Sequence, residues 1–540
     1  MSRIKSTVTR ANIRLPLQLA AALLAGSSLV GMVLGFFRMR QLNALYYNSY
    51  PEGLDAYTVA FTIPDFMFMI LVSGALSVTF IPVFNQRLAT GNKRSAWELS
   101  TSLLNFMAII TLIASILIII FAEPLVRYVV GPGLDESGRA LAVSMMRVIA
   151  VSPFLFAIAT VISSMQQAIG RFTFFALVPI LYNIGILIGI TVFTDGINIF
   201  GWQVFEGGIM GVALGVVLGS ILQLLVSTIG LFGMGFDYRF KIYWKNKGFR
   251  KVLSLLPARS LDQSIDYVNG IAEVNLASRL AAGSVAAYQQ ATTLAYAPVN
   301  LIGVAISTAA FPKMTERLGQ GRPDLFKSEL QTVLRVIIWL ALPVTVIAFF
   351  GRGYLVNFIV NGGDVLMASI LGILAITILF RSIYYISARS FYAQQDTKTP
   401  LYISLFTISL NIALAVWFTL GLDSGVYGIA WAAAIVSAIE VAILFVVMSR
   451  RIQGLFDKVF IHAVARMASA TGFMAVITYV MVSFFPLEAA DQSFFASFPK
   501  FVLIVAVSGV VYLLFSYLLR LKEVGPILER TKKIVFYKAK

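Results

Sequence analysis

The sequence predicts an all-α polytopic membrane protein of about 14 transmembrane helices, built as two six-helix lobes in parallel pseudo-repeat plus two C-terminal helices. Of its 540 residues 59% are hydrophobic and only 12% are charged. Uncharged runs of membrane-spanning length recur along the chain, and 103–122 is one such run of twenty residues, about 30 Å long as a helix. The ten-residue alternating segments of a transmembrane β-barrel are absent.

Glycines, prolines and charge clusters delimit the individual spans. The predicted spans are 15–46, 55–86, 98–122, 140–168, 173–194, 208–234, 254–281, 289–312, 328–350, 365–392, 400–421, 425–448, 459–485 and 498–520. Because their number is even, both termini are expected on the same side of the membrane.

The charge distribution predicts which side that is. Lys and Arg number 42 against 25 Asp and Glu, a net charge of +17. The excess lies at the N-terminus, in alternate short loops such as 239–251 and 450–458, and in the tail up to Lys540. The positive-inside rule therefore places both termini in the cytoplasm. Since the basic residues flank apolar spans, membrane lipids are the expected partner and nucleic acid is not.

Cysteine is absent, which excludes disulfides, thiolate catalysis and Cys-ligated metals. The lone histidine, His462, begins a late span close to Arg466, and this position favours an interfacial polar residue over a metal ligand or a proton relay. No nucleotide-binding Gly-x4-Gly-Lys-Ser/Thr loop occurs, so no cofactor is expected, and the energy for transport would come from Na⁺, H⁺ or the membrane potential.

An internal repeat predicts the arrangement of the spans. Three motif pairs recur in the same order, at displacements of 228, 217 and 230 residues: Gln166 with Gln394, Gly208 with Gly425, and Pro82 with Pro312. A shift of six spans keeps both copies in the same topology, which places the pseudo-symmetry axis along the membrane normal and a cavity between the lobes. The predicted domains are residues 1–235 (spans 1–6), 236–450 (spans 7–12) and 451–540 (spans 13–14 with a basic tail).

The seventh span carries five polar residues on one helical face. They are Arg259, Asp262, Asp266, Asn269 and Glu273, spaced by three or four positions. Each ionisable group at membrane depth costs roughly 2.5–3.5 kcal/mol, so a cavity or a partner is expected there. The face carries one Arg against three acids, which favours a coupling cation or proton over a bound pyrophosphate. An internal ladder of ion pairs is the alternative.

Several motifs resemble the MurJ/MviN family of lipid II flippases, within the multidrug, oligosaccharidyl-lipid and polysaccharide (MOP) exporter superfamily. They are Leu34-Gly-Phe-Phe-Arg38, Leu54-Asp55-Ala-Tyr-Thr-Val-Ala-Phe-Thr-Ile-Pro64-Asp65, Gly74-Ala-Leu-Ser-Val-Thr-Phe-Ile-Pro82, Gly283-Ser-Val285, Phe311-Pro312 and Phe391-Tyr-Ala-Gln-Gln-Asp396-Thr-Lys398-Thr-Pro400. The resemblance covers nearly the whole chain.

This resemblance implies translocation of the undecaprenyl-pyrophosphate-linked peptidoglycan precursor, lipid II, from the inner to the outer leaflet of the bacterial cytoplasmic membrane. It implies alternating access, a central cavity for the headgroup, a lateral groove beside spans 13 and 14 for the lipid tail, and no enzymatic activity. We expect the chain to act as a monomer.

The resemblance also identifies site residues and departures. Family members carry arginine at three cavity positions that are occupied here by Met32, Phe68 and Thr293, while Arg38 and Asp55 match. Since a guanidinium chelates phosphate in a bidentate way, the candidate replacements are Arg40, Arg259, Arg279, Arg381 and Arg389. Arg40 and Arg279 lie near span ends, where a basic side chain also serves as an interfacial anchor.

In the second lobe, Asp396 and Asn411 are candidates to complete an ion site with the stripe on span 7. Lys398, in the Asp-Thr-Lys-Thr-Pro segment, is a candidate gate residue, and a loop that ends a helix before Pro400 is its alternative.

Two other functions stay open from the sequence. One is a sister exporter that moves another lipid-linked oligosaccharide or a drug, which the missing arginines favour. The other is a membrane glycosyltransferase or polymerase, which requires an acidic catalytic loop. The outer loops carry only scattered acids such as Asp135 and Glu488, and this disfavours an enzyme.

Overall fold

A computed structural model describes residues 16–73, 76–199, 202–488 and 490–525. The chain is helical apart from one short hairpin. Within the described residues, thirteen helical segments are long and apolar enough to cross a membrane. Contacts between Cα atoms divide the chain into two compact units, Met1–Ala286 and Ala287–Lys540. The predicted fold class, an all-α polytopic membrane protein, is confirmed.

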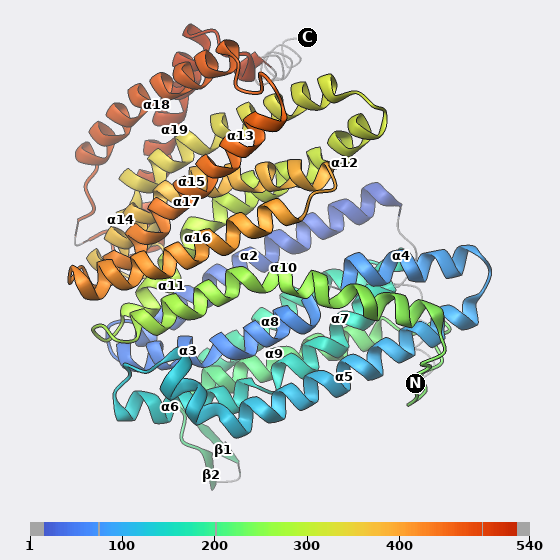
Figure 1. Ribbon diagram of the computed structural model, residues 1–540. Helices are drawn as coiled ribbons and strands as arrows, with labels where there is room; N and C mark the ends of the chain where they lie inside the picture. The colour runs from blue at the N-terminus through green and yellow to red at the C-terminus, as the bar shows by residue number, and fades with distance from the viewer. Residues whose placement is uncertain (1–15, 74–75, 200–201, 489, 526–540) are drawn as a thin grey trace, which may run out of the picture. The chain divides into compact units, whose positions relative to one another are not determined.

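The first unit is a bundle of α-helices interrupted by short π- and 3-10-helical turns (Figure 1). Its elements are α2 (Leu17–Tyr46), α3 (Pro51–Phe68), η1 (Met69–Ser73), α4 (Leu76–Ala89), α5 (Lys93–Pro124), η2 (Leu125–Val130), α6 (Glu136–Ile149), α7 (Ser152–Ala168), α8 (Thr173–Thr191), η3 (Phe193–Asp195), β1 (Ile197–Ile199), β2 (Trp202–Phe205), α9 (Met210–Ile229) and α10 (Lys247–Ala277).

Glycines allow α8 and α9 to pack with their backbones in contact. A Cβ atom added at Gly185 would lie 2.2 Å from the Cα of Gly219, and one added at Gly189 would lie 2.5 Å from the Cα of Gly215. On each helix these glycines are four residues apart, the small-xxx-small spacing that lets membrane helices approach closely. Any side chain at these positions would push the two helices apart.

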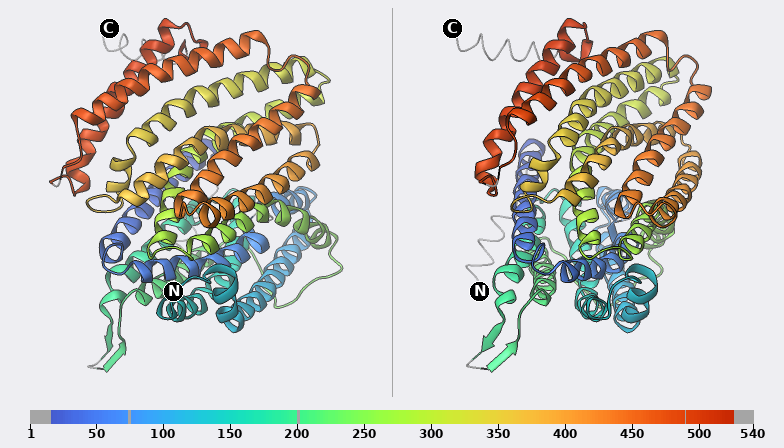
Figure 2. Two further views of the ribbon diagram at one scale, coloured as in Figure 1. Left: turned by 60° about the vertical axis from the view of Figure 1, so that its left-hand side comes forward. Right: turned by 90° about the vertical axis from the view of Figure 1, so that its left-hand side faces the viewer.

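The loop between α8 and α9 forms a two-stranded antiparallel hairpin, which the sequence reading left as a plain loop. Its strands β1 and β2 are flanked by Gly196 and Gly207, whose φ angles of 89° and 96° are open to glycine and strained for other residues. The hairpin projects beyond the helices that it joins (Figure 2).

The second unit follows the same pattern (Figure 1). Its elements are α11 (Ser284–Val299), η4 (Asn300–Val304), α12 (Ala305–Gly319), α13 (Pro323–Phe350), α14 (Arg352–Asn357), α15 (Val365–Ala393), α16 (Lys398–Val416), η5 (Trp417–Gly421), α17 (Val426–Arg451), α18 (Lys458–Phe484), α19 (Phe494–Leu518) and η6 (Lys522–Val524).

The order of elements repeats along the chain as the motif pairs predict. In α3-η1-α4 a π-helical turn begins at Met69, and in α11-η4-α12 the equivalent turn begins at Asn300, 231 positions later. Helices α8 and α16 begin 225 positions apart, and α9 and α17 begin 216 positions apart. The secondary structure therefore carries the same duplication as the sequence.

Two predicted spans differ from the structure. The predicted span 140–168 is two helices, because α6 ends at Ile149 and α7 restarts at Ser152 with a proline in its first turn. The predicted span 254–281 coincides with most of α10, whose 31 residues make a helix about 46 Å long. It is absent from the thirteen apolar candidates because it is rich in charged residues. Contacts group α10 with the first unit, whereas the predicted division by repeats, which begins a lobe at residue 236, stays a prediction.

The second unit has its core around α13. Phe326, Leu330 and Leu334 of α13 and Phe391 of α15 are almost completely buried there. The indole N–H of Trp339 on α13 donates a hydrogen bond to Ser516 Oγ of α19 at 3.2 Å. Helices α18 and α19 thus join the bundle through α13 while keeping an apolar outer surface. In their most apolar windows only 28% and 22% of the residues are buried.

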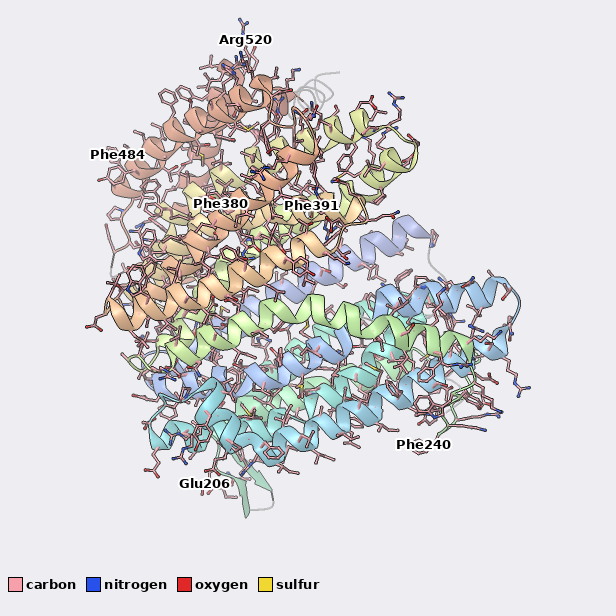
Figure 3. The ribbon with its side chains drawn as sticks, viewed as in Figure 1. Glu206, Phe240, Phe380, Phe391, Phe484 and Arg520 are labelled. Carbon is pink, nitrogen blue, oxygen red and sulfur yellow. The ribbon has the colours of Figure 1, made fainter. Side chains whose placement is uncertain are left out.

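Large aromatic side chains illustrate the two environments (Figure 3). Phe391 is 0% exposed inside the second unit, whereas Phe484, at the C-terminal end of α18, is 75% exposed. An exposed phenylalanine on a membrane helix has hydrocarbon as its natural solvent. Figure 3 labels both side chains.

Candidate functional site

Arg38, the basic residue retained from the family pattern, lies in a polar cluster of the first unit. It is on α2 and interacts electrostatically with Tyr57 and Asp65 of α3 and with Tyr182 of α8. The arginine and both tyrosines are half-buried, and Asp65 is accessible to solvent. We call these four residues the Arg38 cluster.

The chemistry of the Arg38 cluster suits a phosphate. A guanidinium offers five N–H donors in a planar fork, and each phenol offers one O–H donor. Arg38 and Asp65 make no ion pair within 4 Å among the described residues, so the guanidinium is not clamped by that carboxylate. Asp65 balances the charge of Arg38 when the site is empty.

Sequence reasoning overlooked Asp65 as a site residue. It appeared only as the last letter of a family motif. The signal that identifies it is physical: it is an acid at membrane depth, after Pro64 and among apolar residues, where a partner or a cavity is required.

The three positions without arginine supply no positive charge. Met32 is 60% exposed. Phe68 packs edge-to-face on Phe156 with ring centroids 5.3 Å apart. Thr293 returns its hydroxyl to the Gln289 carbonyl of its own helix at 2.9 Å. The departures found in the sequence are therefore real losses of phosphate-binding groups at these positions.

Asp55 holds backbone, not ligand. Its Oδ2 accepts a hydrogen bond from the Gly283 N–H at 2.7 Å, and its Oδ1 accepts one from the Ala286 N–H at 2.8 Å. These donors lie at the start of α11, where helical N–H groups have no partner within the helix. The carboxylate, 3% exposed, therefore caps a helix that follows it by more than 200 positions.

The other predicted arginines of the first unit are placed differently. Arg279 is exposed just after α10, and its Nε donates to Asn275 Oδ1 one turn away at 3.2 Å. This favours the interfacial anchor predicted as its alternative. Arg40 is half-buried on α2, two residues beyond Arg38 and thus on another face of the helix.

Only part of the polar stripe on α10 can be placed. Arg259, Asp262 and Asp266 are helical in their backbone, but their side chains lie outside the described residues. Asn269 donates through Nδ2 to Glu273 Oε1 at 2.8 Å, so these two members of the stripe face each other along the helix.

Arg381 is tied to a buried carboxylate that the sequence reading missed. Its Nη1 lies 3.3 Å from Glu440 Oε2, and the two side chains are 19% and 4% exposed. Glu440 Oε1 accepts hydrogen bonds from the hydroxyls of Ser404 and Thr407, each at 3.1 Å. One carboxylate thus joins α15, α16 and α17. An acid inside the apolar span 425–448 was the available signal for it.

Asn411 lies one turn beyond Thr407 on the same face of α16 and is 4% exposed. The structure therefore brings Asn411 to the side of α16 that faces the Glu440 network. Asp396, its proposed partner, precedes α16 by fifteen positions, about 22 Å along a helix, and so is not brought together with Asn411.

Asp396 instead holds the start of α16 to the end of α17. Its Oδ1 accepts from the Thr399 N–H at 3.0 Å and its Oδ2 from the Thr399 hydroxyl at 2.6 Å, and Oδ2 also pairs with Arg451 Nη1 at 2.6 Å. These hydrogen bonds from Thr399, reinforced by Arg451, lower the pKa of Asp396 to about 2. Arg451, not the exposed Lys398, makes this contact.

Arg389, the remaining candidate cation, is half-buried on α15 beside Tyr385 and Tyr392. No group of three His, Cys, Asp or Glu side chains close enough to bind a metal ion occurs among the residues that the structure describes.

Comparison with known proteins adds a family. The family described as "Lipid II flippase MurJ" matches residues 53–499. A "Probable lipid II flippase MurJ" of Thermotoga maritima is 26% identical over 486 residues, which are 88% of this chain and 92% of that protein. The "Lipid II flippase MurJ" of Burkholderia cenocepacia is 25% identical over 397 residues, 71% of this chain and 74% of its own.

Solved structures agree on the fold. The structure titled "Lipid II flippase MurJ, inward closed conformation" superposes with a TM-score of 0.74 at 23% identity, covering 92% of this chain and 98% of its own. An inward-facing multidrug resistance MATE family transporter of the MOP superfamily gives a TM-score of 0.67 at 16% identity, covering 79% of this chain and 96% of its own. These identities establish a shared fold.

Proposed function

The chain belongs to the MurJ family of lipid II flippases, and from that premise we propose how it holds and moves its substrate. As a member of this family it is a lipid II flippase of peptidoglycan biosynthesis, a multi-pass membrane transporter and not an enzyme. Its substrate is a lipid-linked peptidoglycan precursor.

The proposed contact for the substrate pyrophosphate is the Arg38 cluster. The observation that carries this proposal is the meeting of Arg38, Tyr57 and Tyr182 from three helices of one unit, which supplies phosphate donors while Met32, Phe68 and Thr293 supply no charge. Arg381 is engaged by Glu440, and Arg279 lies exposed at the end of α10. Arg38 is thus the retained cation best placed for the headgroup.

Movement of the substrate is proposed to follow alternating access between the two repeats, with the protein acting as a monomer. The proposed energy source is an ion gradient, carried by Na⁺ or H⁺, or the membrane potential. Its proposed site is the α10 stripe, in which Glu273 and Asn269 face each other and Asp262 and Asp266 share the same helical face. Carboxylate and amide oxygens are suitable ligands for a hard cation.

The proposed location is the bacterial cytoplasmic membrane with both termini in the cytoplasm, from the basic loops. Since the chain has no cysteine, single thiols report topology directly. Gln453→Cys, in the basic loop after α17, is expected to resist a membrane-impermeant maleimide in spheroplasts, and Asp423→Cys, before α17, is expected to react. The reverse labelling pattern would overturn the orientation.

The function is tested by replacing a host's own lipid II flippase with this chain and measuring how much lipid II an external, impermeant hydrolase cleaves. Wild type is expected to restore cleavage, and Arg38→Gln to abolish it at equal expression. Arg94→Gln, which removes an exposed cation paired with Glu98, is the matched control and should flip normally. Normal flipping by Arg38→Gln would refute the proposed headgroup contact.

A further inference from the structure

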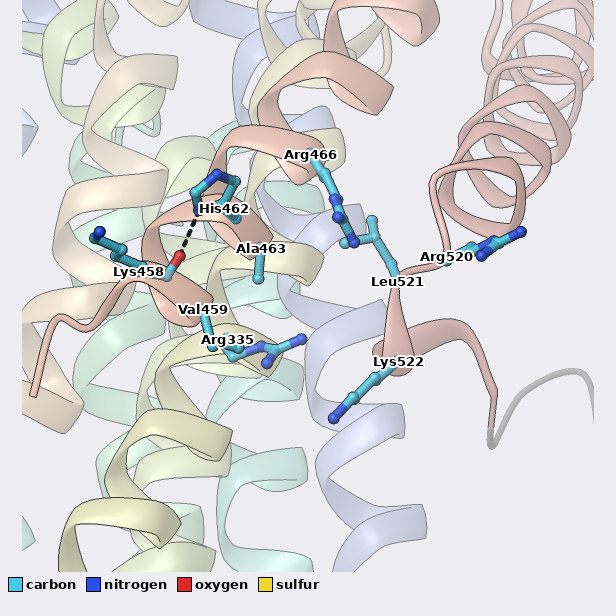
Figure 4. Close-up of a pocket in the computed structure, with 9 residues that line it drawn as sticks. All are labelled: Arg335, Lys458, Val459, His462, Ala463, Arg466, Arg520, Leu521 and Lys522. Atoms are coloured by element: carbon cyan, nitrogen blue, oxygen red, sulfur yellow. Dashed lines mark hydrogen bonds between the residues drawn. The ribbon is translucent and has the colours of Figure 1, made fainter.

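The second unit contains a basic pocket at one end of its bundle, away from the groups discussed so far. It has a volume of about 290 Å³. Its lining residues, which define the basic pocket, are Arg335, Lys458, Val459, His462, Ala463, Arg466, Arg520, Leu521 and Lys522 (Figure 4). Five of the nine are cations and none is an acid.

Three elements place these cations together. Lys458, His462 and Arg466 are spaced by four on α18 and therefore share one face. Arg335 comes from α13, and Arg520 comes from the turn that ends α19. The His462 ring Nδ1 is bonded to the Lys458 carbonyl at 2.6 Å and must donate there, because a carbonyl only accepts (Figure 4).

The turn after α19 presents Arg520 in a costly conformation. Its φ is +55°, in the left-handed region where helix ends normally carry glycine. The N–H of Leu521 returns to the Ser516 carbonyl at 2.9 Å, and Leu521 is 4% exposed. The chain therefore turns back onto the bundle at a position where arginine replaces the favoured residue.

Most of this charge is uncompensated within the described residues. Arg335 pairs with Glu523, Nε to Oε1 at 2.6 Å, and both side chains are largely buried. No ion pair in the described part of the chain involves Lys458, Arg466, Arg520 or Lys522. Four cations around one small cavity repel each other unless an anion lies between them.

The neighbourhood of the pocket is apolar and open. Val459 and Ile461 at the start of α18 are 65% and 55% exposed, and Tyr517 and Leu518 at the end of α19 are 61% and 59% exposed. A ligand with a phosphate and hydrocarbon chains matches both surfaces. The volume lies at the lower edge of small-molecule sites, roughly 300–1,000 Å³, so it suits a compact headgroup better than a glycopeptide.

We propose that the basic pocket binds the phosphate of an anionic phospholipid from the surrounding leaflet, with the acyl chains lying along α18 and α19. Basic pockets between membrane helices are suited to such headgroups. The bound lipid would neutralise the repulsion and hold the ends of α13, α18 and α19 together. The inference requires only that the chain spans a membrane and is independent of the lipid II cargo.

The test uses the absence of native cysteine. Full-length Val459→Cys carries a fluorophore in the pocket and is reconstituted in phosphatidylcholine vesicles with an equal small fraction of spin-labelled phosphatidylglycerol or spin-labelled phosphatidylcholine. We expect several-fold stronger quenching by the phosphatidylglycerol. Arg466→Gln/Arg520→Gln should reduce its relative affinity about 25-fold, at about five-fold per cation. Equal quenching by both lipids in the unsubstituted pocket would overturn the proposal.

Three further arms separate the explanations. Lys241→Gln/Arg450→Gln removes two exposed cations elsewhere and should keep the lipid preference. Arg466→Lys/Arg520→Lys keeps the charge and should keep the preference too, and its loss there would refute an electrostatic site. If inorganic phosphate alone changes the fluorescence and phosphatidylglycerol adds nothing, the pocket binds free phosphate and the lipid assignment is wrong.

Discussion

The Arg381–Glu440 pair gives the sharpest test of the distinction between a structural arginine and one that binds substrate. Removing one partner of a buried ion pair costs about 3–5 kcal/mol, because the other charge stays buried and unpaired. Since Arg381 is 19% exposed and water reaches part of it, we expect the lower figure, about 3 kcal/mol, for Glu440→Gln. The glutamine oxygen still accepts the hydrogen bonds of Ser404 and Thr407.

The double variant Arg381→Met/Glu440→Gln removes both charges together. We expect it to lose no more free energy of unfolding than either single variant, which gives a coupling energy of about 3 kcal/mol. The measurement is denaturant unfolding of wild type and the three variants in the same mixed micelles. Lipid II cleavage from outside is measured in parallel, and the double variant should flip where Arg381→Met alone fails.

Two results would refute this reasoning. If the two single effects add within about 0.5 kcal/mol, the residues do not interact energetically. If the double variant is as stable as expected but cannot flip lipid II, Arg381 contacts the substrate, as the resemblance first suggested, and the pairing with Glu440 is only its resting state.

Three other perturbations have clear expectations. Asp55→Ala removes two charge-assisted hydrogen bonds and should lower the free energy of unfolding by about 3 kcal/mol, measured by denaturant unfolding. Gly189→Ala should lower it by about 1–3 kcal/mol because its new Cβ meets the α9 backbone, whereas Gly472→Ala, with open space around it, should not. Asp396→Asn should destabilise the protein fully above about pH 4 and lose its effect as the pH falls through about 2, because the folded pKa lies below the unfolded value of 3.8.

Each of these has a result that would contradict it. Glu52→Gln removes a carboxylate from the same helix as Asp55 and should be nearly neutral, so an equal loss in both variants would indicate a general charge effect. Normal stability of the Gly189 variant would mean that α8 and α9 separate easily. A pH-independent effect of Asp396→Asn would show that its hydrogen bonds, and not its charge, stabilise the start of α16.

The sequence predicted the fold well because its signals are strong and local. Uncharged runs such as 103–122 allow only one structure in a membrane, and the motif pairs near 220 residues apart reappear as paired π-helical turns at Met69 and Asn300. The hairpin 197–205 was missed because three- and four-residue strands carry too little alternation to detect.

The candidate site was harder to predict, because contacts depend on packing between distant helices. Asp55 was identified by family pattern as a substrate contact, yet its carboxylate caps α11, a pairing over more than 200 positions that no local pattern reveals. Glu440 stood in the sequence as a single acid in an apolar span. Only the packing of α15 and α16 against α17 shows that its partner is Arg381.

The π-helical turns η1 and η4 affect how relatives of this chain should be aligned. A π-turn holds one residue more than an α-turn, and each residue rotates an α-helix by about 100°. Side chains of α4 and α12 therefore point about 100° away from where an unbroken helical wheel drawn from α3 or α11 would place them. A relative that lacks the extra residue would turn a different stripe of its sequence toward lipid, even at high identity. Gaps of one residue at Met69–Ser73 or Asn300–Val304 should thus be treated as changes of helix face.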